Sequence, residues 1–292
     1  MNWKKLLSVL LFSVLMLSLA SCKNKGDAKA SVVRKENVDK QTFQIEQTAV
    51  TKSDAFEDSG VSVSVTGLSY EDYVTKIKLH VKNDTDDVLR ITTANLSVNG
   101  LMCTESYFAQ VEAGTTQDAF IEISNSWLGK MGISKIAELE FMVKVFDSLY
   151  NEILSSDILK VTTDAHGSYR QNYETSGVVI YEKDDVRLVA RSLAKSAHSD
   201  DYELEFYVEN NKDTAISIAA KDVSVNNQEI EALFVVSVLP GKKCLDTMVF
   251  YADDLKDANV KNISSVSAVF QAFDANFAPI FETEKISIPI QK

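Results

Sequence analysis

Apolar and polar residues alternate one by one along several stretches of this chain. The clearest runs are Val61, Val63 and Val65; Ile77, Leu79 and Val81; Leu139, Phe141, Val143 and Val145; and Leu204, Phe206 and Val208. A period of two is typical of β-strands that bury one face. Pairs that favour tight turns, such as Asn99-Gly100 and Pro240-Gly241, lie between the runs. The pattern predicts an all-β protein with one short helical piece per half, around Trp127-Leu128 and over residues 253–258.

The body of the chain is a tandem repeat. The segment LHVKNDTDDVLRITTANLSVNG begins at Leu79, and FYVENNKDTAISIAAKDVSVNN begins 127 residues later at Phe206. This offset continues without a gap to Val161 and Ile288. About seven short strands in each copy of about 110 residues predict a two-sheet sandwich. Farther upstream, residues 59–61 and 176–178 both read Ser-Gly-Val, which predicts about ten extra residues between the first two strands of the second copy.

Both copies carry the same succession of short motifs. These are V-x-N-x-x-D, then [DN]-[LV]-S-V-N, then a Gly, then F-D before the final strand. The succession resembles the immunoglobulin-like domains of Gram-positive cell-envelope lipoproteins. The resemblance implies two tandem immunoglobulin-like β-sandwiches, and it carries over no functional residue because these motifs belong to turns and cores. The Cys-Trp-Cys pattern of antibody domains is missing, since Trp127 has Asp254 as its counterpart.

The N-terminus has the features of an export signal. Lys4 and Lys5 precede an apolar run over residues 6–19, which as a helix would rise about 21 Å and so fall short of a bilayer core. The run is therefore interpreted as part of a signal peptide. Its end, Leu19-Ala20-Ser21-Cys22, resembles the lipobox of bacterial lipoproteins. That resemblance implies cleavage before Cys22 and acylation (palmitate or a similar chain) of its sulfur, which would anchor the protein to the membrane; a plain secretory signal with an accidental Cys is the alternative.

These observations predict five segments along the chain. They are a signal peptide over 1–21, a lipidated Cys and flexible tether over 22–55, a first β-sandwich over 56–163, a linker over 164–173 and a second β-sandwich over 174–292.

The net charge of the chain and its small numbers of His and Cys residues exclude several classes of function. The net charge of −12 and the pI of about 4.8 argue against a nucleic-acid partner, because phosphate contact needs a basic surface. None of the three His (His80, His166, His198) has the context of a catalytic triad. Metal-ligand spacings of the Cys-x-x-Cys kind are missing, so no cofactor is expected. Cys103 and Cys244 do not match in the repeat; they are expected to be buried free thiols or a disulfide between the two domains.

Acidic turns offer one weak metal site. Asp84, Asp86 and Asp87 lie together in a loop whose oxygens would suit calcium, although the EF-hand spacing is missing. Turn chemistry alone also explains acidic residues at such a position.

Aromatic residues supply the candidate ligand contacts. Tyr150 and Phe277 occupy the same repeat position, three residues after the matched Asp147 and Asp274. They are expected either to be exposed contact residues or to fold back over their hairpins. In the first copy, Trp127 with Tyr107 and Phe108 would form either a face that stacks on glycans or ordinary core packing; these three positions are the second set of candidates.

The sequence therefore predicts an extracytoplasmic, non-enzymatic binding or interaction lipoprotein, anchored by lipid to the bacterial cell membrane. An envelope protein or a glycan is the expected partner. The alternative is an accessory or structural subunit of an envelope complex, docked on a transporter or an enzyme.

Overall fold

The protein is an all-β molecule with two hydrophobic cores, as the sequence predicts. The computed structural model describes residues 31–35, 43–196 and 199–291. The first core is formed by residues between 56 and 161, and the second by Val32 together with residues between 180 and 290. Within the described residues, no helix has the length and apolar character needed to cross a membrane.

The first copy contains eleven of the strands and one short helix. Their bounds are β2 Val50–Ser53, β3 Ala55–Asp58, β4 Val61–Tyr70, β5 Val74–Asn83, β6 Leu89–Val98, β7 Leu101–Met102, β8 Phe108–Val111, β9 Thr115–Ser124, α2 Asn125–Lys130, β10 Glu138–Phe146, β11 Glu152–Ser155 and β12 Leu159–Thr163. One sheet has the order β3-β4-β5-β9, and the second is built around β6 and β10, with β10 also pairing β11 and β12. Strand β2 extends the second sheet by pairing with β12.

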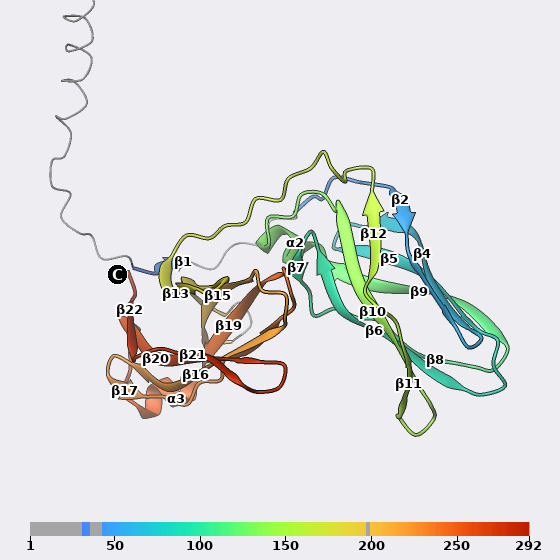
Figure 1. Cartoon of the computed structure of the whole chain (residues 1–292). Helices are drawn as coiled ribbons and strands as arrows, with labels where there is room; N and C mark the ends of the chain where they lie inside the picture. Colours follow the sequence, from blue (N-terminus) through green and yellow to red (C-terminus); the bar gives the residue numbers. More distant parts are fainter. Residues whose placement is uncertain (1–30, 36–42, 197–198, 292) are drawn as a thin grey trace, which may run out of the picture. The chain divides into compact units, whose positions relative to one another are not determined.

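The second copy repeats the order of β3 to β12 element by element (Figure 1). Its elements are β13 Val178–Lys183, β14 Val186–Lys195, β15 Tyr202–Asn210, β16 Ile216–Val225, β17 Gln228–Glu229, β18 Val235–Val238, β19 Lys243–Phe250, α3 Ala252–Asp257, β20 Ser265–Asp274, β21 Pro279–Glu282 and β22 Ile286–Pro289. Strands β13, β14, β15 and β19 continue the sheet that holds β6 and β10, because Lys243 in β19 pairs in parallel with Leu101 in β7 and so makes one twelve-stranded sheet. Strands β16 and β20 are the centre of the other sheet of the second copy. Alternate residues of strands β5 and β10 are buried, which is why the period of two identified these strands.

The second core is richer in aromatic rings than the first. Phe206, Phe234 and Phe270 contact one another with ring centroids 4.6 to 6.3 Å apart. The residues at the same repeat positions in the first copy are Leu79, Tyr107 and Val143. The two copies therefore share a backbone plan but fill it with different side chains, as close-packed interiors require.

The repeated asparagines are buried connectors. Asn83 at the end of β5 and Asn210 at the end of β15 are fully buried, and each side-chain amide donates to three backbone carbonyls. The acceptors are those of Asp87, Val111 and Glu112 around Asn83, and of Thr214, Val238 and Leu239 around Asn210. A backbone N–H two residues on also donates to each Asn carbonyl oxygen. Asn83 therefore connects the loop that follows β5 to the β8–β9 turn. Asn210 connects the loop that follows β15 to the β18–β19 turn in the same way.

The upstream part of the predicted repeat is wrong. In the structure, the turn at Ser59-Gly60 corresponds to the turn at Asp184-Asp185, because β3–β4 and β13–β14 pair in the same register around them. All four residues have positive φ, which Asp adopts more readily than most residues. The match of Ser-Gly-Val at 176–178 was accidental, and there is no insertion of about ten residues between these strands.

The predicted flexible tether over 22–55 is also wrong in part. Residues 33–35 form strand β1 (Val33–Lys35), which pairs with β14, and β2 and β3 begin at Val50 and Ala55. Phe43 and Ile45 pack against the first core. The segment over 164–173, predicted as a linker, lies between β12 and β13 and is bound to the first copy. Its last residue, Tyr173, donates its hydroxyl to Asn99 O at 2.7 Å.

Candidate functional site

The hairpin that follows β10 is closed by one carboxylate. Asp147 Oδ1 accepts the backbone N–H groups of Leu149 and Asn151 at 2.8 and 2.9 Å. The Asp147 N–H donates to Asn151 O at 3.0 Å, and the Tyr150 N–H donates to Asp147 O at 3.2 Å. Hydrogen bonds from the side chain and backbone of Asn151 lower the pKa of Asp147, and the backbone N–H of Leu149 and the nearby Arg90 charge act in the same direction.

The hairpin that follows β20 has the same construction. Asp274 Oδ1 accepts the N–H groups of Asn276 and Ala278 at 2.8 and 2.9 Å. The Asp274 N–H donates to Ala278 O at 2.9 Å, and the Phe277 N–H donates to Asp274 O at 3.0 Å. The repeated F-D motif is therefore a loop-forming motif, and its Asp is occupied by the backbone in both copies.

Each of these loops presents one aromatic side chain to solvent. Tyr150 is 64% exposed and Phe277 is 83% exposed, so neither ring folds back over its hairpin. Both residues are in the left-handed region, with φ of 67° and 61°. That conformation costs a residue with a Cβ atom about 1–2 kcal/mol. The same exposed ring type in the same uncommon conformation in both copies defines the candidate contact residues, which we call the hairpin tips.

The two hairpin tips differ in polarity. The Arg90 guanidinium lies over the Tyr150 ring, 4.2 Å from its centroid, and Arg90 Nη1 donates to Asp147 O at 3.1 Å. Leu149 beside it is 78% exposed. At the Arg90 position the second copy has Ser217, whose hydroxyl is bonded to Ser237 instead. The first tip thus combines a ring with a cation, and the second presents a bare apolar ring.

A second pair of matched positions adds apolar surface on the same sheets. Phe108 in β8 and Val235 in β18 are each 57% exposed. Phe108 is the register partner of Thr92 in β6, two residues after Arg90, so Phe108 and Arg90 lie on one face of the sheet. The alternation of apolar and polar residues did not identify this pair of positions. The feature that could have identified it is an apolar residue, in both copies, at a strand position where the alternation predicts a polar residue.

The predicted stacking face of Trp127, Tyr107 and Phe108 does not form. Trp127 lies in α2 and packs, half-buried, against the first core. Tyr107 is buried, and its hydroxyl accepts from Gln117 Nε2 at 2.6 Å. Phe108 is the exposed member, because neighbouring residues of a strand point to opposite faces. Trp127 is therefore a packing residue, and its assignment as a ligand contact is corrected.

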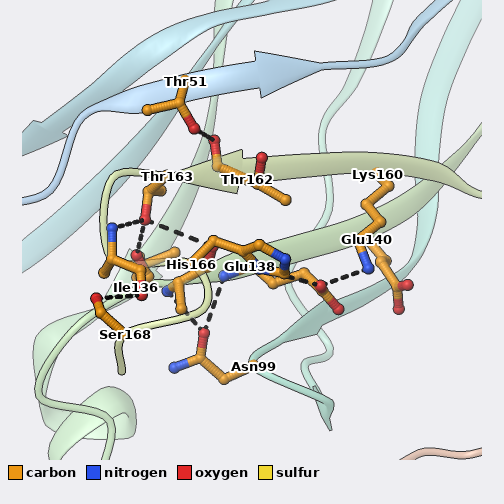
Figure 2. Close-up of polar contacts among 12 residues, drawn as sticks. Thr51, Asn99, Ile136, Glu138, Glu140, Lys160, Thr162, Thr163, His166 and Ser168 are labelled. Atoms are coloured by element: carbon orange, nitrogen blue, oxygen red, sulfur yellow. Dashed lines mark hydrogen bonds and ion pairs between the residues drawn. The ribbon is translucent and has the colours of Figure 1, made fainter. Parts of the chain in front are cut away.

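The polar cluster beside β10 and β12 is structural (Figure 2). Asn99 Oδ1 accepts the N–H groups of Ala137 and Glu138, and Glu138 pairs with Lys160 Nζ at 2.5 Å. His166 Nδ1 lies 3.6 Å from the Glu138 carboxylate. In the second copy Asn226 accepts the N–H groups of residues 264 and 265 in the same way. The S-V-N motif thus fixes the start of the strand that follows α2 or α3.

The remaining candidates from the sequence occupy separate places. His80 pairs with Asp118 at 2.9 Å on an exposed sheet face, and His198 and Cys22 lie outside the described residues. Cys103 is buried and Cys244 half-buried, and both are free thiols in the structure. Burial raises the pKa of Cys103 to about 11 and that of Cys244 to about 12.

The acidic loop over 84–87 is organised around an amide. Asp84 pairs with Lys82 at 2.5 Å, and the Asp87 carbonyl accepts from Asn83. In the part of the chain that the structure describes, no group of three or more His, Cys, Asp or Glu side chains is placed to hold a metal ion. The side chains of Asp84, Asp86 and Asp87 are thus not brought together as ligands.

No protein-family model matches the chain, and no curated protein sequence matches it. Similar solved structures include a transglutaminase of red sea bream (6% identity, TM-score 0.23), covering 81% of this chain and 32% of that one. Another is a protein of unknown function from Porphyromonas gingivalis W83 (10%, TM-score 0.22), covering 80% and 98%. A third is titled pT26-6p (9%, TM-score 0.23), covering 85% and 67%. This chain spans about a third of the transglutaminase's length, and we draw nothing about function from these structures.

Proposed function

We propose that this protein is a membrane-anchored, extracytoplasmic binding lipoprotein without enzymatic activity, of the kind found in the envelope of Gram-positive bacteria. The apolar run that ends in Leu19-Ala20-Ser21-Cys22 supports export and lipidation at Cys22. The strongly acidic composition supports a partner that is not a polyanion. Two or more acyl chains give stable anchoring where one alone is marginal.

The observation that carries the binding function is the repetition of the hairpin tips. Tyr150 and Phe277 are exposed at matched positions, on loops whose backbone is closed by Asp147 and Asp274. A rigid loop loses little conformational entropy on binding, and aromatic side chains dominate the energetics of interfaces. Two tips on one chain would also allow bivalent contact, which raises apparent affinity without any new kind of contact.

The carboxylates next to the tips support a binding role over a catalytic one. Asp147 and Asp274 each accept two backbone N–H groups, so their oxygens are used to hold the loop. A general acid or base must instead be free to exchange a proton with substrate near its working pH.

The test is capture of a partner by the full-length protein crosslinked in native membranes. Tyr150→Ala and Phe277→Ala are compared singly and together with Tyr73→Ala, a matched control that removes a Tyr ring 75% exposed in another loop. Loss of one hot-spot ring of about 2 kcal/mol weakens binding about thirtyfold. Unchanged capture by the double variant would contradict the role of the tips.

The nature of the captured material separates the two classes of partner. Polysaccharide without a protein partner supports a display module, whereas one envelope protein captured in stoichiometric amount supports an accessory subunit. A soluble form for this experiment should begin at Ser31, because β1 belongs to the fold.

The anchor is tested separately by phase partitioning. A Cys22→Ala protein that has lost residues 1–21 is expected to move from the detergent phase to the aqueous phase, because it has neither the acylated residue nor the apolar run over 6–19. If it stayed in the detergent phase, lipidation at Cys22 would be refuted.

A further inference from the structure

A segment from before the first copy completes the second copy. Strand β1 runs parallel to β14, with Val33, Arg34 and Lys35 opposite Ser192, Leu193 and Ala194. Figure 1 shows this short strand, in blue, beside the yellow-brown β13 and the red C-terminal end of the second copy. The Val32 N–H donates to Pro289 O at 2.8 Å, and the Gln291 N–H donates to Val32 O at 2.9 Å. Residues 31–35 are therefore joined both to β14 and to the end of β22.

Side chains make this junction specific. Val32 is fully buried in the second core. Arg34 Nη2 donates to Ile263 O at 2.6 Å, and its guanidinium lies 5.9 Å from the centre of the Tyr202 ring. Backbone pairing, a buried apolar residue and a bonded cation act together over five residues, which is how strand addition gains both affinity and specificity.

The chain immediately before the second copy does not take this place, because it is bound to the first copy. Gln171 Nε2 donates to Gly132 O at 3.1 Å. The hydroxyl groups of Tyr169 and Ser134 are 3.3 Å apart. Strand β2 pairs with the last strand of the first copy. Val32, just before β1, forms a parallel bridge with Ile290, just after the last strand of the second copy. The second copy thus receives its first strand from the N-terminal end of the protein.

We propose that residues 31–35 are the attachment strand of this lipoprotein, so that the second copy, and not the first, is the module held next to the membrane. This inference rests on the lipid anchor at Cys22 under the proposed function. Residues 23–30 and the bond to Ser31 can span at most about 32 Å. The chain from Cys22 to Phe43, where contact with the first core begins, can span more than twice that length, roughly 70 Å.

The docking of β1 is tested by disulfide trapping in the membrane-bound protein. Lys35→Cys is combined with Ala194→Cys, its register partner, in a chain whose Cys103 and Cys244 are replaced by Ala. Adjacent strands lie about 4.8 Å apart, within the Cα separation of about 4.4–6.8 Å that disulfides accept.

The matched control for this pair uses the first copy. Ser69 in β4 has the place that Ala194 has in β14, so Lys35→Cys with Ser69→Cys should remain reduced. We expect mild oxidation to give an intramolecular crosslink in the Ala194 pair alone. No crosslink, a crosslink to Ser69→Cys, or a crosslink between two chains would each overturn the attachment of β1 to its own second copy.

Proximity to the membrane is tested by energy transfer to a lipid headgroup acceptor in liposomes carrying the purified full-length lipoprotein. One donor dye is placed at Gln291→Cys beside β1, and another at Lys52→Cys, an exposed residue of β2 in the first copy. We expect stronger transfer from Gln291→Cys. A Val32→Asp substitution, which removes the buried contact, should reduce the difference between the two positions.

The outcomes distinguish the two proposals. Stronger transfer from Lys52→Cys overturns the attachment strand while leaving the anchor in place. No transfer from either dye, together with unchanged partitioning of Cys22→Ala, overturns the anchor and with it the membrane-proximal second copy. The disulfide result does not depend on the anchor, so it tests the docking of β1 even if Val32→Asp fails to fold.

Discussion

The buried Asn210 allows a sharp test of whether the two copies are stabilised separately. The substitution Asn210→Asp keeps the shape of the side chain but removes its N–H donors. Three carbonyl acceptors at 2.9, 2.9 and 3.1 Å then face a carboxylate oxygen. The residue is fully buried, so water does not replace the lost partners.

The expected loss follows from the number of bonds. Three hydrogen bonds at about 1 kcal/mol each, and at least one buried carbonyl left without a partner at about 1–3 kcal/mol, give a destabilisation of roughly 4 kcal/mol or more. A domain of this size has a free energy of unfolding of about 5–15 kcal/mol. Asn210→Asp should therefore remove a large part of the stability of the second copy.

The assay is urea unfolding of a form that begins at Ser31. Of the two Trp residues in the chain this form keeps Trp127, which packs against the first core, so Trp fluorescence reports the first copy. Far-ultraviolet circular dichroism reports both copies. We expect Asn210→Asp to shift part of the dichroism transition to lower urea and leave the fluorescence transition in place. Asn83→Asp should shift the fluorescence transition together with the other part of the dichroism transition.

Asn211→Asp is the control, since this neighbour is exposed and its bond to Asp185 O uses the backbone N–H. The reasoning is refuted if Asn210→Asp costs less than about 1 kcal/mol, or if it shifts the Trp127 transition as far as the dichroism transition.

Three further outcomes are expected. The pKa of Asp147 is lowered in the folded protein, so its contribution to holding the hairpin is present above pH 4 and is lost as the pH falls through the lowered pKa. The rate of protease cutting within residues 148–150 should therefore rise on the acid side. A rate that does not change with pH would refute this prediction. In the folded protein Cys103 and Cys244 should react slowly with an aromatic disulfide at pH 8, because burial raises the pKa of both thiols and keeps them protonated at that pH. In denaturant both should react rapidly. Equal rates in the two conditions would contradict their burial. Val32→Ala should lower the stability of the second copy by about 1–2 kcal/mol, whereas Val33→Ala, at a side chain 48% exposed, should change it by less than about 0.5 kcal/mol in the same unfolding assay.

The repeat and the strands were predictable because both leave a direct trace in the sequence. Strand β10 buries every second residue from Leu139 to Val145, and a half-buried strand is the simplest source of that period. The offset between the copies held from Val81 onward because the matched Asn, Gly and Asp residues fix turns that tolerate few substitutes. For Tyr150 and Phe277 the sequence left two alternatives, an exposed ring or a ring folded back over its hairpin. The structure shows both rings exposed.

What the sequence missed depends on contacts between distant residues. Strand β1 has three residues and pairs with β14, so no local period marks it. The turn formed by Ser59-Gly60 in the first copy is formed by Asp184-Asp185 in the second, and these different residues adopt the same positive φ. A search for identical residues therefore aligned Ser59-Gly60 with Ser176-Gly177 instead. Trp127 was left with two alternatives, a ligand contact or core packing, because composition alone cannot show that α2 lies on the core.

The place of β1 in the second copy has a consequence for the biogenesis of this protein. Residues 31–35 are synthesised before every other described element, whereas their partners in β14 and β22 follow only after the whole first copy. The first copy can fold while synthesis continues, but the second copy closes its sheet with the earliest described part of the chain. Contacts of such long sequence separation form slowly. Folding of the second copy is therefore expected to be the last step, completed only after β22 has been made.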